Sequence, residues 1–285
     1  MKRISILYVL CGFVLAGCGN KEVDTTENDV FVYISTNPLS DLGKSATTME
    51  ENLISKFLLY GVNDKNVVVK TFPAITDPPL DGIQLIIPKE VKTLYAIANP
   101  SAGIENVNPS SLSGLLNLTG DFTTVPVSPF LMSGKGDVTG SNVSIVLTRA
   151  VAKIEVIAHN EFVIESVTVK NTPDKGYVFK KETIAAPTSS RRVDYSANTT
   201  NSIVYVAENS KNSPTELVVS GTYLNKRASY TIVLKNNLAP IDIARNTYYK
   251  VNISAITDSE CTVSITILVW DVKETDDHII PDENF

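Results

Sequence analysis

Thr262–Val269 reads TVSITILV and has the clearest strand pattern in the chain. Apolar and polar side chains alternate along it: Val263, Ile265, Ile267 and Val269 against Thr262, Ser264 and Thr266. Because successive side chains of a strand point to opposite faces, this segment predicts a strand with one apolar side and one polar side. Cys261, just before it, is expected to pack in or beside the same strand.

Short β-branched and aromatic runs occur along the rest of the chain. Turn residues separate them at intervals of roughly 8–14 positions, which is typical of β-sandwiches. No long 3.6-residue apolar period is present, and only Pro109–Leu118 is compatible with a short helix. We interpret Glu50–Tyr60 as a turn entering a strand and Gly134–Gly140 as a hairpin turn. The predicted strands are Val30–Ser35, Lys56–Val62, Val67–Phe72, Ile83–Ile87, Thr93–Ala98, Val143–Leu147, Ile154–Ile157, Ser166–Lys170, Tyr177–Phe179, Ile203–Ala207, Glu216–Leu224, Tyr230–Leu234 and Tyr248–Ile253.

These runs predict an all-β, mostly antiparallel fold with two sandwiches that meet near Thr148–Ala150. A length of 285 residues agrees with about two domains. Hydrophobic residues make up 43% of the chain and charged residues 20%, which is a folded globular composition. We expect an N-terminal domain over 30–148 and a C-terminal domain over 149–285.

Composition also limits the chemistry. The net charge of −6, without a basic cluster, argues against a nucleic-acid partner, since phosphates attract clustered Lys and Arg. The chain has only two His and three Cys, and His159 lies far from His278. Motifs of serine hydrolases, zinc proteases and EF-hands are absent. We therefore predict no enzyme activity, no cofactor and no metal site.

The N-terminus has the pattern of a lipoprotein signal peptide. Lys2 and Arg3 precede the apolar run Ile4–Ala16, which is too short to span a bilayer of about 30 Å comfortably. The run leads to Cys18 within LAGC, which looks like a bacterial lipobox. Residues 1–17 are then a signal peptide, and acylated Cys18 anchors the protein in the outer membrane with more than one acyl chain. The alternative is an ordinary signal peptide with a chance cysteine.

Cleavage before Cys18 would leave a polar, acidic tether over 18–29. Cys11 would be lost with the signal peptide and Cys18 would be acylated. Cys261 would then be the only free thiol, so no intrachain disulfide is expected.

Four segments, in this order along the chain, resemble the fimbrillin family of Bacteroidales, the subunits of type V pili. They are Pro129–Gly136 (PFLMSGKG), Leu147–Val156 (LTRAVAKIEV), Tyr205–Ser210 (YVAENS) and Ile243–Ser254 (IARNTYYKVNIS). The resemblance implies two transthyretin-like β-sandwich domains in a lipoprotein that assembles with other fimbrial subunits on the outer membrane surface and contributes to adhesion. From the residues alone, Arg149, Lys153 and Glu155 are interpreted as a solvated strand face.

The resemblance further implies assembly by strand exchange, in which a first strand is released and a strand of another subunit fills its groove. Here the displaceable strand is Val30–Ser35, with Val30, Phe31, Val32, Tyr33 and Ile34 as the residues of the site. Burying about five of these side chains would contribute on the order of 7–15 kcal/mol. Release requires a cut after a basic residue, and Lys44, followed by Ser45, is the only basic residue between Glu22 and Ser55. The alternative is a solvated Lys44 that is never cut.

The tail 271–285 (DVKETDDHIIPDENF) is a poor donor strand because it is acidic and Pro281 interrupts it. An uncut first strand together with such a tail favours an anchor or accessory subunit over a stalk subunit. The stalk, tip and anchor roles stay open at this point, as does a receptor on a host or bacterial surface. A glycan-binding surface lipoprotein that uses Trp270 and scattered tyrosines is the second hypothesis.

Overall fold

The computed structural model describes residues 27–36, 50–79, 82–158, 160–197, 202–236, 238–256 and 261–270. Strands dominate these residues, and both helices are short. In chain order the elements are β1 (Glu27–Ser35), the 3-10 turn η1 (Glu50–Asn52), β2 (Lys56–Val62), β3 (Val68–Thr71), β4 (Ile75–Thr76), β5 (Ile83–Pro88), β6 (Thr93–Ala98), α1 (Ala102–Glu105), α2 (Leu112–Leu116), β7 (Thr119–Asp121), β8 (Met132–Asp137), β9 (Asn142–Val146), β10 (Thr148–Arg149), β11 (Val151–Ile157), β12 (Phe162–Pro173), β13 (Lys175–Tyr177), β14 (Arg192–Ala197), β15 (Ile203–Ala207), β16 (Glu216–Tyr223), β17 (Lys226–Val233), β18 (Lys235–Asn236), β19 (Ala239–Pro240), β20 (Thr247–Ile256) and β21 (Cys261–Val269).

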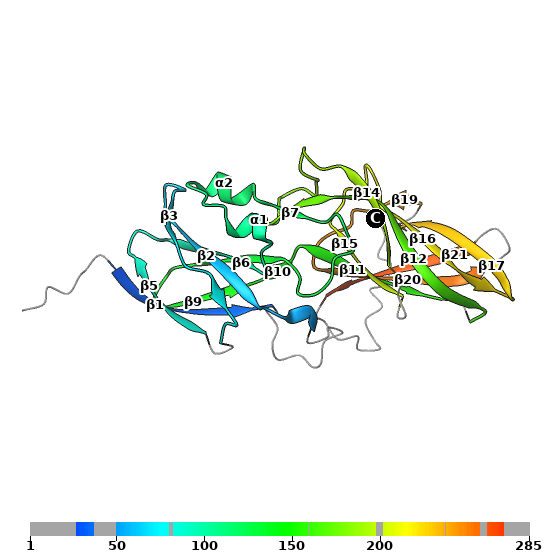
Figure 1. The fold of residues 1–285 in the computed structure, drawn as a ribbon, viewed down its shortest axis with the longest axis horizontal. Coiled ribbons are helices and arrows are strands. Elements are labelled where there is room, and N and C mark those ends of the chain that lie inside the picture. Colours follow the sequence, from blue (N-terminus) through cyan, green and yellow to red (C-terminus); the bar gives the residue numbers. More distant parts are fainter. Residues whose placement is uncertain are drawn as a thin grey trace, which may run out of the picture.

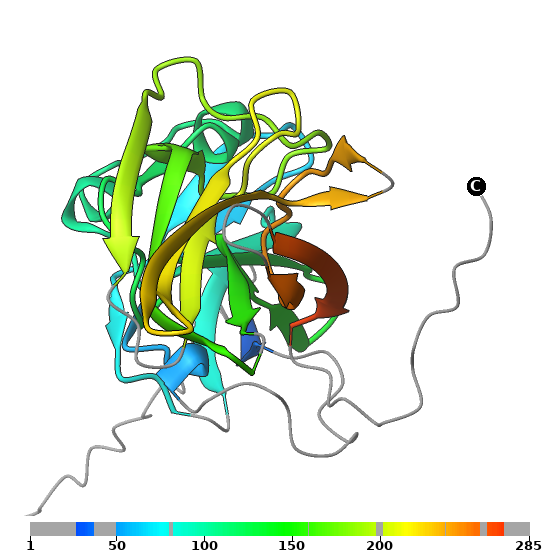
Figure 2. The same ribbon diagram turned by 90° about the vertical axis from the view of Figure 1, so that its right-hand side faces the viewer.

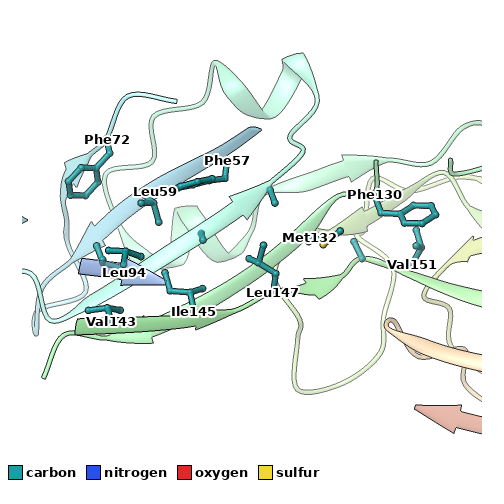
Figure 3. Close-up of a cluster of buried hydrophobic side chains, with 14 of the residues drawn as sticks. Phe57, Leu59, Phe72, Leu94, Phe130, Met132, Val143, Ile145, Leu147 and Val151 are labelled. Atoms are coloured by element: carbon teal, nitrogen blue, oxygen red, sulfur yellow. The ribbon is translucent and has the colours of Figure 1, made fainter. Parts of the chain in front are cut away.

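The first half of the chain forms a sandwich of two sheets. One has the strand order β5-β1-β9 and the other β10-β8-β6-β2-β3, with β4 paired to β2. An apolar core lies between them, and ten of its residues are labelled in Figure 3. β2 and β6 are buried on both faces, which explains why they are continuously apolar: Phe57 and Leu59 face this core, whereas Leu58 and Tyr60 face a second cluster beneath α1 and α2.

Two glycines of β8 let the sheets of this sandwich approach closely. A Cβ at Gly134 would lie 2.2 Å from the carbonyl oxygen of Val146, and a Cβ at Gly136 would lie 2.5 Å from that of Ser144. The interpretation of Gly134–Gly140 as a turn is therefore wrong for its first half, because β8 continues to Asp137. The chain turns after β8, before β9 begins.

The second half forms a sandwich of the sheets β15-β11-β20-β21 and β14-β12-β16-β17, which enclose a separate core. Figure 2 views the molecule from this end. β21 is an edge strand with β20 as its one neighbour among the described residues. Val263 and Ile265 pack against the core, but Ile267 and Val269 are 45% and 65% exposed. The predicted apolar side of this strand is therefore only partly covered, since an edge strand has less of the facing sheet above it.

The two halves follow one another along an elongated molecule (Figure 1) and are joined by shared contacts. β13 of the second half pairs with β7 of the first, and the first core includes Val151, Tyr248 and Trp270 from the second. The all-β fold is confirmed, and most pairings are antiparallel; β1 with β9 and β11 with β20 are parallel. The domain limits at 148 and 149 stay a prediction.

The helical content is confirmed in part. α2 lies within Pro109–Leu118, and the Ser111 hydroxyl caps it by accepting a hydrogen bond from the Gly114 N–H. α1 was not foreseen. Among the described residues, neither helix reaches the length and apolarity needed to cross a membrane.

Candidate functional site

β1, the predicted displaceable strand, lies in the middle of a three-stranded sheet. It runs antiparallel to β5, with Val32 opposite Ile83, and parallel to β9, with Val32 opposite Val143. The Phe31 N–H donates a hydrogen bond of 2.7 Å to the Ser141 carbonyl. Both backbone edges of β1 are therefore paired, so its departure would leave unpaired edges on two strands.

The side chains of β1 divide into a buried and a partly covered set. Val30 and Val32 are 1% and 0% exposed and belong to the first core, against which Ile34 packs. Phe31 is half-buried on the other face beside Tyr33, which is 44% exposed. The expectation of about five buried side chains is therefore wrong, because alternation places Phe31 and Tyr33 on the outer face.

Gly82 shapes the outer side of this site. Its φ of +97° favours glycine, and a Cβ there would lie 2.6 Å from Cε1 of Phe31 and 3.0 Å from the Val32 carbonyl oxygen. Gly82, directly before β5, thus leaves room for the Phe31 ring of β1.

A buried polar network lies beside the end of β1, where the two sandwiches meet. Glu51 of η1 is buried, and its carboxylate pairs with Lys153 Nζ of β11 at 2.9 Å and accepts a hydrogen bond from the Tyr205 hydroxyl at 2.5 Å. The indole N–H of Trp270 lies 3.5 Å from the same carboxylate. Burial, followed by the neighbouring Glu51 carboxylate, raises the pKa of Tyr205.

Arg149 completes this network and is fully buried. It donates from Nε to the Glu51 carbonyl at 3.0 Å, from Nη1 to Asn246 Oδ1 at 2.8 Å, and to the side chain of Asn52. Its guanidinium also lies 4.6 Å from the centre of the Trp270 ring. The interpretation of Arg149 and Lys153 as a solvated face is therefore wrong, because residues about a hundred positions away in sequence cover and pair both cations.

The segments that carry the family resemblance converge at this junction. Leu147–Val156 supplies Arg149 and Lys153, and Tyr205–Ser210 supplies Tyr205 and Glu208. Arg245, from the fourth segment (Ile243–Ser254), forms a buried ion pair with Glu208. It also donates from Nη1 to the Val178 carbonyl at 2.8 Å, which ties the loop after β13 to the second sandwich. These segments therefore build an interface between the sandwiches.

The remaining predicted site residues lie outside the described residues. These are Cys18, Lys44, Ser45, the tail 271–285, His159 and His278. In the part of the chain that the structure describes, no group of three His, Cys, Asp or Glu residues is arranged to hold a metal. Trp270 is buried against Phe130 and Tyr205, so its assignment as a surface platform for glycans is wrong.

Comparisons with known proteins identify the family of this chain. Solved structures share the fold: a candidate cell adhesion protein from Bacteroides eggerthii (TM-score 0.62, 15% identity, covering 87% of this chain and 97% of that one), another from Parabacteroides distasonis (0.58, 15%, 87% and 98%), and the tip fimbrial protein Mfa3 from Porphyromonas gingivalis with a C-terminal truncation (0.57, 12%, 85% and 100%). A search of curated proteins finds no match. The family described as "Fimbrillin-A associated anchor proteins Mfa1 and Mfa2" matches residues 116–276, more than half of the sequence. The chain therefore belongs to this family of fimbrillin-A associated anchor proteins.

Proposed function

We propose that this protein is an accessory subunit of a fimbrium, held in the outer membrane through acylated Cys18, and that β1 occupies the groove that a strand of another subunit would fill in strand exchange. The observation that carries the proposal is the position of β1 between β5 and β9, with both of its backbone edges paired. An extended segment of another subunit that took the place of β1 would pair with both β5 and β9.

The energetics of β1 favour exchange over simple loss. Val30 and Val32 together contribute about 3–6 kcal/mol by burial, at ~1.5–3 kcal/mol each, and the half-buried Phe31 and Ile34 add less. Simple loss would expose this apolar groove and two strand edges to water. A donor strand that restores both would therefore bind without an energy source such as ATP.

Whether the chain is cut after Lys44 decides the place of the subunit in the fibre. If the chain is not cut there, β1 stays covalently attached and keeps its own groove filled. Such a subunit accepts no donor strand, so it terminates the fibre at the membrane, where acylated Cys18 anchors it. We favour this anchor role. A cut between Lys44 and Ser45 would instead convert the protein into an acceptor within or at the far end of the fibre.

Mass spectrometry of the protein from cell-surface material tests the proposal. The anchor role expects an acylated Cys18 at the mature N-terminus, and the variant Cys18→Ser should leave the membrane fraction. A mature N-terminus at Ser45 would exclude the anchor role and support the acceptor role. Strand exchange at β1 expects heat- and SDS-resistant complexes with other subunits once the chain is cut after Lys44. Their absence from surface material that contains assembled fimbriae would refute it.

A further inference from the structure

β21 (Cys261–Val269) leaves one backbone edge open at the side of the second sandwich. It pairs along its full length with β20 and, among the described residues, with no strand on its other side. The irregularity in this pairing lies between Ile253 and Ala255 of β20, so β21 itself runs without a bulge. An uninterrupted strand edge of this kind is a template for another extended segment.

The composition of β21 sets it apart from the other outer strands. Natural proteins protect open sheet edges with charges, with proline or by keeping the edge strand short. In the larger sheets of the described residues, β3 carries Lys70, β5 ends at Pro88, β14 contains Arg192 and Asp194, β17 begins with Lys226 and Arg227, and β9, β10 and β15 have five residues or fewer. β21 has nine residues without a charge or a proline, so it lacks each of these protections.

The apolar side of β21 is also incompletely covered. Val263 and Ile265 pack against the second core, whereas Ile267 and Val269 are 45% and 65% exposed. The opposite side bears three exposed hydroxyl residues, Thr262, Ser264 and Thr266. A further strand beside β21 would therefore cover two apolar side chains on one face and would meet hydroxyl groups on the other.

The absence of charge on β21 defines the strand that fits it. A charged strand would give up water without gaining an opposite charge, so the matching strand is uncharged and alternates apolar and hydroxyl residues. The tail 271–285 does not match, because it is acidic and contains Pro281. β21 itself does match. We propose that β21 pairs antiparallel with β21 of a second copy of this chain, which joins two four-stranded sheets into one.

An antiparallel pair centred on Ile265 is complementary on both faces. Ile267 then lies opposite Val263 of the second copy, and Val269 lies opposite Cys261 of the second copy. The exposed apolar side chains thus gain apolar neighbours, and the hydroxyl residues of the other face lie opposite one another. No like charges meet within the pair, because neither strand carries a charge.

The direction of β21 fixes how the two copies point. Cys261 packs against the second core and Leu268 against the first, so β21 runs along the long axis of the molecule toward the first sandwich (Figure 1). An antiparallel pair therefore places the two first sandwiches at opposite ends. If Cys18 anchors each copy, which rests on the function proposed above, the two anchors point away from each other. The pair then suits a contact between two facing membranes, and so between neighbouring cells.

Sedimentation velocity of residues 19–285, without acylation, measures the pairing. An interface based on one strand pair is small, so we expect a dimer with a Kd of about 10–100 μM. The double variant Ser264→Lys/Thr266→Lys brings lysines opposite one another and should weaken the dimer about tenfold or more. Ser229→Lys/Thr231→Lys is the matched control, because these exposed residues lie on β17, the outer strand of the facing sheet. It should leave the dimer unchanged.

Hydrogen exchange then locates the contact. Backbone amides of β21 should exchange more slowly as the protein concentration rises, whereas those of β17 should not change. The proposal is overturned if the chain stays monomeric at millimolar concentration or if the two double variants have equal effects. It is also overturned if a dimer appears only after residues 271–285 are removed, since the tail would then be what covers this edge.

Vesicles that carry the acylated protein test how the two copies are arranged. Clustering of the vesicles that is lost in Ser264→Lys/Thr266→Lys and kept in the β17 control supports a contact between facing membranes. A dimer in solution without clustering of vesicles would overturn that arrangement. None of these results depends on a cut after Lys44 or on SDS-resistant complexes, so they are distinguishable from the tests of strand exchange.

Discussion

Replacing Val32 by Ala in β1 should accelerate the release of the first strand after the chain is cut. Val32 is fully buried in the first core, and the substitution removes two methyl groups. At ~0.8 kcal/mol for each group, with a further contribution from the small cavity left behind, the loss is about 2 kcal/mol. Because affinity changes within one interface appear mainly in dissociation, release should become roughly 30-fold faster.

The assay uses the mature chain with a recognition sequence for a site-specific protease at position 44 and a fluorophore at its N-terminus. After cleavage, loss of the labelled fragment is followed by fluorescence anisotropy or by native mass spectrometry. Val163→Ala is the matched control, because Val163 of β12 is 66% exposed. That change should alter stability by less than about 0.5 kcal/mol and leave release unchanged. Equal release rates for the two variants would show that side-chain burial does not hold β1, and the reasoning would fail.

Three further predictions concern the buried network, the contact between sheets and the response to acid. Glu51→Ala leaves Lys153 buried without its carboxylate, so we expect a loss of about 3–5 kcal/mol in chemical denaturation, whereas an unchanged midpoint would contradict the ion pair. Gly134→Ala should cost about 2–3 kcal/mol, since its Cβ meets backbone, whereas Gly140→Ala, with nothing within 4 Å, should be tolerated; similar melting temperatures for the two variants would refute the close approach. The Arg191 N–H is the main cause that lowers the pKa of Asp174, so this carboxylate stabilises the fold above its ordinary pKa and the contribution is lost as the pH falls below about 4. Asp174→Asn should therefore be less stable than the native protein at neutral pH and should approach it in acid, as thermal melts across this range would check.

Many of the strands could be predicted because their signal is local, but β8 was interpreted as a turn and β14 was not predicted. Alternation and β-branched composition located β1, β2, β6, β9 and β20, and most of their predicted ends lie within about one or two residues of the observed ends. α1 could not be predicted, since a helix of four residues has too few positions to show a period. The role of Gly134 was equally hidden, because the carbonyl that excludes a side chain there belongs to another sheet.

The buried network could not be predicted for the same physical reason. Arg149 and Lys153 alternate with apolar residues, as cations do on a strand with one solvent-exposed face. Their burial depends on Glu51, Asn246 and Trp270, which the fold brings from distant parts of the chain. One signal was present: the segments resembling fimbrillins contain both cations, Glu208 and Arg245, which a purely solvated role would not require.

The parallel pairing of β1 with β9 has a consequence for the order of folding. Parallel strands are not joined by a hairpin, and Val143, the partner of Val32, follows it by more than a hundred positions. Contacts this distant in sequence form slowly. β1 is therefore synthesised before β9 and can pair with it only after β9 has also been synthesised. If strand exchange takes place as proposed, the groove between β5 and β9 is empty for an interval during folding, and another extended segment would compete with β1 for it in that interval.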